Sequence, residues 1–262
     1  MQRSIKMLSL ILSTCFINDV YSYSLLNTCR GEGNTLLRAQ YNELDDFFKN
    51  QDYCVATLDD NTIPRECVAF GQDMDGNEIW AVSELFGNKV YIIPNGTFSE
   101  MKAAINNVIT LKDIKGVWGI AYKDKDWYIF DYFQFYKFQI KQSNGKYSID
   151  KWQSTSDPFP YDSIENWRWD GNLGNGLDDN SYIITKKYPN NITFEASYSK
   201  FKYNDKEIYS SGDIYGFCYN QKGRIMICQK WITSRLVLVT IPELLIDKPN
   251  FAELYWKDIL GV

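Results

Sequence analysis

The feature that most constrains the fold is an acidic turn between two apolar runs, within residues 63–82. Apolar residues run up to Gly71. The chain then reverses through Asp73, Asp75 and Gly76 before apolar residues return. An Asp-Gly pair in this setting favours a β-hairpin, because glycine readily adopts the positive φ that the turn needs.

Two further segments, residues 118–130 and 215–227, resemble each other without gaps. Each has an aromatic residue and a glycine, a strand that ends in tyrosine, a polar turn with a lysine, and a second apolar strand. Aligning Gly76 with Gly223 adds the first hairpin to this set. Three related hairpins suggest repeated β-units that stack their apolar faces, and chance similarity of short hairpins is the alternative.

Most of the remaining chain alternates in the manner of strands and is rich in aromatic and β-branched residues. Helical spacing of apolar residues occurs over 34–50, over 249–260, and after the capping-box pattern Thr97-Phe-Ser-Glu100. The predicted fold class is therefore mainly β: repeated β-hairpins with a few short helices, stabilised by disulfides.

The composition of residues 156–181 changes in a way that suggests a boundary. Ser156-Asp-Pro-Phe-Pro160 interrupts any regular element, and residues 167–181 are dominated by Gly, Asn and Asp, which is typical of loops. We divide the chain into β-rich halves, 23–160 and 161–262, which form either one domain or two.

The first residues have the features of a secretory signal. Arg3 and Lys6 precede an apolar run of about ten residues, and Val20-Tyr-Ser22 fits a cleavage site. The alternative is a buried core helix. We expect a signal peptide over 1–22 and a secreted, extracellular protein. No later segment reaches the roughly 20 apolar residues of a transmembrane helix, so no membrane span is predicted.

Charge and composition exclude several functions. The formal net charge is -5, and no basic cluster is present, so the chain is not expected to bind nucleic acid. Histidine is absent. This absence excludes Ser-His-Asp and Cys-His catalysis, and histidine-ligated zinc. An enzyme would have to use carboxylates, tyrosine, lysine or a bound metal.

One of the six cysteines lies in the predicted signal peptide. Spacing does not determine how the other five pair. We expect two bridges that close short loops. One joins Cys54 to Cys67, and the other joins Cys218 to Cys228. Cys29 is then left either as a buried thiol or as a site of intermolecular pairing, which would give a covalent dimer.

Two Asn-x-Thr tripeptides are candidate glycosylation sites in a secreted protein. One begins at Asn95 and the other at Asn191.

The first hairpin and the strand after it contain a dense motif: Pro64, Val68, Gly71, Asp73, Asp75, Gly76, Ile79, Trp80 and the element Gly87-Asn-Lys-Val90. This motif resembles the repeat of the natterin-like lectins. The chain departs from the family pattern at Cys67, at Ser83 in place of an arginine, and at the inserted Asn88.

This resemblance implies a β-rich fold and the binding of mannose-type glycans. It nominates Asp73 or Asp75, together with Lys89, as residues that contact sugar hydroxyls. The chemistry is independent of the family, because hydroxyls donate to carboxylates, accept from ammonium groups, and accompany an apolar ring face that stacks on aromatics. Trp80 would supply the stacking surface. The alternative is that the aspartates bond amides of their own turn.

Calcium is a weaker possibility at the same turn. Asp73-Met-Asp-Gly-Asn77 copies the first three ligand positions of an EF-hand loop, and Glu84 falls at the twelfth. However, Glu78 replaces the turn glycine, and the flanks are typical of strands. We assign no metal ligand, and a looser calcium site here or at 170–179 stays open.

Three functions are compatible with these observations. The first is a secreted, non-enzymatic lectin-like protein whose partners are glycans or glycoproteins. The second is a histidine-free extracellular glycan hydrolase that uses paired carboxylates. The third is a structural or toxin-like secreted protein. We favour the first and assign no catalytic residue.

Overall fold

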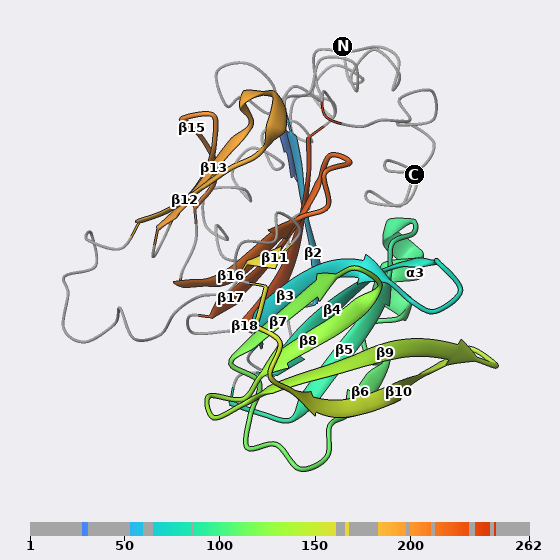
Figure 1. Ribbon diagram of the computed structural model, residues 1–262. Coiled ribbons are helices and arrows are strands. Elements are labelled where there is room, and N and C mark those ends of the chain that lie inside the picture. Colours follow the sequence, from blue (N-terminus) through green and yellow to red (C-terminus); the bar gives the residue numbers. More distant parts are fainter. Residues whose placement is uncertain are drawn as a thin grey trace, which may run out of the picture.

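A computed structural model describes the positions that follow: 28–30, 53–59, 65–84, 86–160, 166–167, 183–197, 200–210, 213–230, 234–241 and 244. Within these ranges the chain forms four antiparallel sheets (Figure 1). The mainly β fold class is therefore confirmed. Every helix in the described ranges is too short or too polar to cross a bilayer.

Two of the sheets are built chiefly from the N-terminal half. Sheet B contains, in spatial order, β11 (Asn166–Trp167), β3 (Arg65–Gln72), β4 (Glu78–Glu84), β5 (Lys89–Pro94) and β6 (Val108–Thr110). Sheet C contains β10 (Lys146–Thr155), β9 (Phe135–Ser143), β8 (Asp126–Phe130) and β7 (Gly119–Lys123).

The other two sheets come chiefly from the C-terminal half. Sheet A contains β1 (Thr28–Arg30), β2 (Tyr53–Asp59), β18 (Ser234–Thr240), β17 (Arg224–Lys230) and β16 (Asp213–Tyr219). Sheet D contains β12 (Ile183–Lys187), β13 (Thr193–Ser197), β14 (Lys200–Tyr203) and β15 (Lys206–Ser210).

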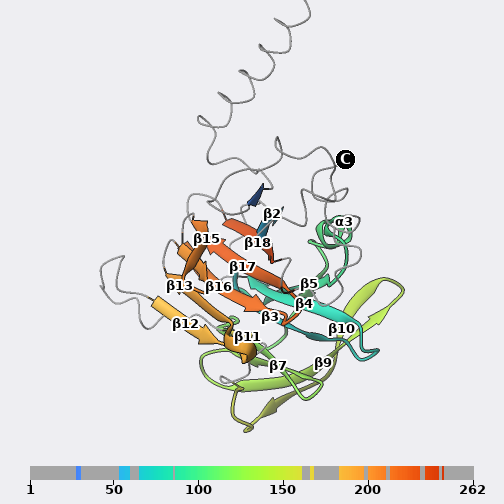
Figure 2. The same ribbon diagram turned by 90° about the horizontal axis from the view of Figure 1, so that it is seen from above.

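The sheets stack in the order D, A, B, C, so that sheets D and C lie at opposite sides of the molecule (Figures 1 and 2). In β4, Trp80 packs in the core between sheets A and B, whereas Ile79 packs in the core between sheets B and C. Successive strand residues point to opposite faces. Because both faces of sheet B are covered, the central residues of β4 are all buried.

The three hairpins expected from the sequence all form, as β3–β4, β7–β8 and β16–β17. The first and third share a turn geometry in which Gly76 has a φ of 86° and Gly223 a φ of 93°. The β7–β8 turn is tighter, because Lys123 pairs directly with Asp126.

The first residue of each matching turn has the same role. Asp73 Oδ1 accepts hydrogen bonds from the backbone N–H groups two and four residues later, at 3.0 and 2.9 Å. Asn220 Oδ1 accepts the equivalent pair at 2.9 and 3.0 Å. The similarity that the sequence suggested between these two hairpins therefore extends to individual side-chain contacts.

Strands cross the division between the two halves in both directions. In sheet B, the neighbouring strands β3, β4, β5 and β6 follow one another in sequence order. In sheet A, the corresponding neighbours are β16, β17, β18 and then β2. The N-terminal strand β2 thus completes the sheet of the C-terminal half. Conversely, strand β11 of the C-terminal half pairs with β3 of the N-terminal half.

The helix α3 (Phe98–Ala103) begins at the expected capping box, in which Thr97 and Glu100 exchange side-chain bonds with each other's backbone N–H groups. Phe98 and Met101 anchor it in the core between sheets A and B. The predicted helices at 34–50 and 249–260, the signal peptide and most of the loop at 167–181 lie outside the described residues.

The predicted bridge between Cys218 and Cys228 is not seen: neither residue forms a disulfide. The register gives the reason. Cys218 lies opposite Met226, and Cys228 lies opposite Gly216, so the two cysteines are diagonal neighbours. Diagonal positions are about 7–8 Å apart. A disulfide needs Cα atoms within about 4.4–6.8 Å.

The predicted bridge between Cys54 and Cys67 is not seen either. Cys54 lies on β2 in sheet A. Cys67 is buried in the core between sheets B and C. Stacked sheets are about 10 Å apart, so this pairing would have to cross from one layer to another.

Candidate functional site

The Asp73 carboxylate in the acidic turn is engaged in hydrogen bonds within the turn itself. Besides its two backbone donors, Asp73 accepts from Asn77 Nδ2 through Oδ2 at 3.0 Å. Both carboxylate oxygens are thus engaged, and Asp73 is buried. Asp75, by contrast, is exposed. Of the two aspartates nominated from the sequence, only Asp75 has an accessible side chain.

The other two nominated residues do not join this turn. Trp80 is fully buried, and its Nε1 donates to Asn95 Oδ1 at 3.3 Å, so it offers no surface for stacking a sugar. Lys89 lies beyond the opposite end of β4, where its Nζ is 3.8 Å from a carboxylate oxygen of Glu84. A seven-residue strand is about 20 Å long. The expected binding site of Asp73, Asp75, Trp80 and Lys89 is therefore not assembled.

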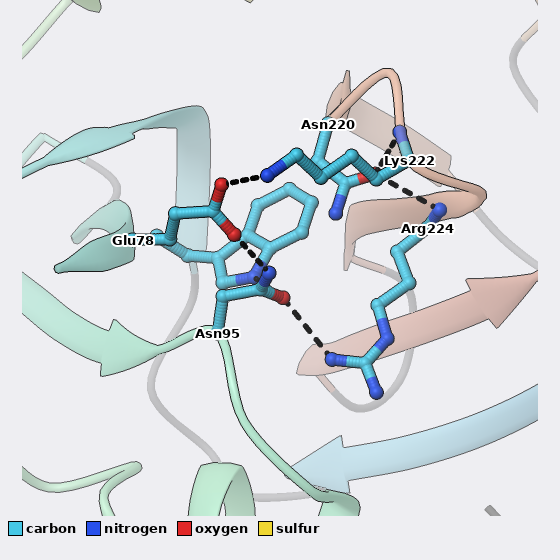
Figure 3. A network of polar contacts seen from close by, with 6 residues as sticks. Glu78, Asn95, Asn220, Lys222 and Arg224 are labelled. Atoms are coloured by element: carbon cyan, nitrogen blue, oxygen red, sulfur yellow. Dashed lines mark hydrogen bonds and ion pairs between the residues drawn. The ribbon is translucent and has the colours of Figure 1, made fainter. Parts of the chain in front are cut away.

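A polar network instead joins the tips of the two matching hairpins (Figure 3). Glu78 forms an ion pair with Lys222 and accepts from Asn95 Nδ2 at 2.8 Å. Asn95 Oδ1 accepts from Arg224 Nη1 at 3.1 Å. The same Nη1 donates to the Gly96 carbonyl at 2.6 Å. These bonds connect β4, β17 and the β5–α3 connection. Arg224 is buried within this network.

The two glycosylation candidates lie in different surroundings. The Asn95 amide nitrogen donates to Glu78 within the hairpin-tip network. A glycan on this nitrogen would therefore compete with an internal bond. Asn191 is exposed at the end of the short 3-10 helix η4 (Pro189–Asn191).

A buried ion pair links β2 to β3. Arg65 pairs with Asp59, and its guanidinium lies 4.7 Å from the centre of the Tyr91 ring. Burial raises the pKa of the nearby Cys228 thiol to about 12. Glu66 contributes in the same direction, while Arg65 opposes it. Because a thiolate is the reactive form of cysteine, Cys228 is expected to be inert in the folded protein.

Exposed aromatic side chains gather at three connections near one end of sheets B and C. We define the aromatic surface as Phe86, Trp118, Tyr132 and Phe133. Three of these residues are largely exposed: Phe86 (61%), Tyr132 (52%) and Phe133 (67%). Trp118 lies half-buried between two of them, with ring centres 5.3 Å from Phe86 and 5.4 Å from Tyr132. The Lys115 ammonium lies 4.5 Å from the centre of the Phe133 ring.

The backbone beneath the aromatic surface is strained. Phe86, Asp113 and Tyr132 have φ values of 53°, 61° and 77°. This left-handed region is unfavourable for most residues other than glycine. Aspartate and asparagine tolerate it, whereas bulky residues such as Phe86 and Tyr132 are uncommon there. Such conformations persist only where neighbouring contacts enforce them, and they concentrate at functional sites.

Buried polar groups hold two of these three conformations, those at Asp113 and Tyr132. The Asp131 carboxylate accepts from the backbone N–H groups of Phe133 at 2.9 Å and Gln134 at 2.8 Å, which fixes the β8–β9 turn. The Tyr136 hydroxyl lies within hydrogen-bond distance of the Asp113 carbonyl at 3.1 Å and of Asp131 Oδ2 at 3.3 Å. Burial, with a smaller contribution from Asp131, raises the pKa of Tyr136.

The three connections are also joined through their backbones. Val117 donates to the Gly87 carbonyl at 2.9 Å, and Trp118 donates to the Phe130 carbonyl at 2.8 Å. The rings are therefore presented by a framework of fixed turns. Within the described ranges, no group of three or more His, Cys, Asp or Glu residues could hold a metal ion.

Reasoning from the sequence missed this surface, because aromatic residues occur throughout the chain and most of them belong to the core. One signal was available. Asp131-Tyr-Phe-Gln134 places two adjacent aromatics beside an aspartate that can cap a turn, between two strand-like runs. Adjacent aromatics in a turn cannot both be buried as easily as alternating ones in a strand.

Comparison with known proteins gives no family for the chain: no protein-family model matches it, and neither does any curated protein.

Proposed function

We propose that this protein binds glycans through the aromatic surface, without catalysing a reaction. The observation that carries the proposal is the set of adjoining exposed rings on three fixed connections. The apolar face of a sugar ring packs against aromatic rings, and its hydroxyls bond charged and polar groups nearby.

The charges around the rings fit the same ligand class. Lys115 places an ammonium group over Phe133, where it can donate to a sugar hydroxyl. Exposed apolar patches of this kind mark interaction sites on proteins. A rigid aromatic platform also loses little conformational entropy on binding, which favours affinity for a small polar ligand.

The resemblance to natterin-like lectins supports mannose-type glycans as the first ligands to test. The predicted signal peptide supports a secreted protein that meets glycans or glycoproteins outside the cell. Under this proposal Asp75 is an exposed residue outside the main site, at the other end of β4 from Phe86. Lys89 is half-buried and follows Phe86 by three residues, so Asp75 provides the direct comparison between the site inferred from the sequence and the aromatic surface.

The test is a glycan array with the mature protein, residues 23–262, followed by titration of the glycans that bind. Two variants remove exposed rings: Phe133→Ala and Tyr132→Asn, since asparagine tolerates the left-handed conformation at position 132. We expect each to weaken binding about tenfold, equivalent to about 1.4 kcal/mol. Thermal unfolding of each variant verifies that the fold is retained.

Met74→Ala is the matched control, because Met74 is a large exposed apolar residue on the acidic turn. It should bind glycans as tightly as the unaltered protein. Loss of binding in Asp75→Ala or Lys89→Ala, with normal binding by the aromatic variants, would return the site to the residues inferred from the sequence. Absence of binding to every glycan would refute the proposed function.

A further inference from the structure

Two cysteines occupy directly opposed positions at the edge of sheet A. Strands β1 and β2 pair in antiparallel orientation, and Cys29 lies opposite Cys54 in their register. The flanking pairs are Thr28 with Val55 and Arg30 with Tyr53, so the two cysteines are at the centre of the ladder.

This register position suits a disulfide. Directly opposed residues of an antiparallel pair have Cα atoms about 4.5 or 5.5 Å apart, depending on the hydrogen-bonding pattern. Both spacings fall within the range of about 4.4–6.8 Å that disulfides require. Directly opposed positions of an antiparallel pair also belong to the same face of the sheet.

The other described cysteines are placed differently. On its other side, position 54 pairs with Thr240 of β18. Cys218 and Cys228 lie on β16 and β17, and β18 separates both of these strands from β2. Cys67 packs in the core between sheets B and C. Cys29 is therefore the cysteine that the fold brings opposite Cys54.

We propose that Cys29 and Cys54 form a disulfide that joins β1 to β2. The reaction needs a disulfide oxidant, such as oxidised glutathione or the active-site disulfide of a thiol–disulfide oxidoreductase. One cysteine thiolate attacks the oxidant and releases its first thiol. The second cysteine then attacks this mixed disulfide, forms the Cys29–Cys54 bond and releases the second thiol. Two protein thiols are oxidised, and one oxidant disulfide is reduced to two thiols.

This bond replaces both earlier expectations for the two residues. Cys54 is no longer the partner of Cys67, and Cys29 is no longer available for a covalent dimer. The bridge also closes the chain between positions 29 and 54 into a loop. It does not depend on glycan binding, so either proposal can fail while the other holds.

The test uses the mature protein, equilibrated in a buffer of oxidised and reduced glutathione. Remaining thiols are alkylated at denaturing concentrations of urea, and the protein is digested without reduction. Mass spectrometry should recover a peptide pair that joins Cys29 to Cys54, with Cys67, Cys218 and Cys228 alkylated. Recovery of Cys29 or Cys54 in alkylated form, joined to a different cysteine, or joined across two chains would overturn the proposal.

Cys29→Ser and Cys54→Ser form a matched pair of variants. Reduction with dithiothreitol should lower the Tm of the unaltered protein to the Tm of the variants, and it should leave the variants unchanged. A fall in Tm on reduction that persists in both variants would place the responsible disulfide elsewhere. The peptide analysis of the unaltered protein decides the question if a variant does not fold.

Discussion

Arg224 is the residue whose removal should most clearly show what joins the two matching hairpins. Its guanidinium is buried, and one nitrogen donates to Asn95 Oδ1 and to the Gly96 carbonyl. In Arg224→Ala both acceptors lose a charged donor. Asn95 Oδ1 keeps its bond from Trp80, whereas this variant provides no replacement for the Gly96 carbonyl.

The expected magnitude follows from these contacts. A hydrogen bond from a charged group contributes about 1.5–3 kcal/mol, so two such bonds set a range of about 3–6 kcal/mol. Removing a buried charge also relieves its desolvation penalty, which places the expected loss near the lower end, at about 3 kcal/mol. For a chain of this size that loss corresponds to a fall in Tm of about 6–12 °C.

Lys222→Ala is the matched control, because it removes the other cation of the same network. The Lys222 side chain is 46% exposed and pairs with Glu78 at the surface. Exposed ion pairs contribute about 0–1 kcal/mol. Urea unfolding of both variants, with equal m values, gives the comparison. If Arg224→Ala were no more destabilising than Lys222→Ala, the network would not be what holds the hairpin tips together.

Two further predictions concern packing and pH. A Cβ at Gly216 would lie 2.4 Å from the Glu66 backbone oxygen, so Gly216→Ala should destabilise by about 3 kcal/mol in urea unfolding. Gly145→Ala meets nothing within 4 Å and should cost only about 1 kcal/mol for its positive φ, so equal losses would contradict the packing argument. Burial raises the pKa of the Cys228 thiol in the folded protein to about 12. The stability that this thiol contributes is therefore fully present below its pKa in the unfolded chain, and is lost as the pH rises towards its pKa in the folded protein. Between about pH 9 and 11 the free energy of unfolding should fall about 1.4 kcal/mol per pH unit more steeply than in Cys228→Ala, and parallel curves would refute this assignment.

Local turn and cap chemistry made parts of the fold predictable from the sequence. The hairpin around Gly76 is determined by a few neighbouring residues, and so is the capping box of Thr97 and Glu100. Such features depend on contacts between residues two to four positions apart. They form wherever the tertiary structure leaves room for them, so a short window of sequence contains the needed information.

The stacking of the sheets could not be predicted in this way, and the site depends on that stacking. Trp80 and Tyr132 are both aromatic residues beside polar turns, yet Trp80 is fully buried and Tyr132 is 52% exposed. The difference arises because sheet A covers one face of sheet B, through contacts between strands far apart in sequence. The pairing of Cys29 with Cys54 likewise depends on the register of two strands, which cysteine spacing does not reveal.

The acidic motif of the first hairpin is accounted for by its structural role. At the matching turn, Asn220 accepts the same two backbone bonds as Asp73, although asparagine has no charge. This turn therefore does not require a carboxylate. Where Asp73 supplies one, both of its oxygens accept hydrogen bonds within the turn. A residue that serves the backbone in both hairpins marks the repeated fold rather than a ligand site. The aromatic surface is different, because exposed rings on strained backbone add nothing to the core, and a ligand would account for their position.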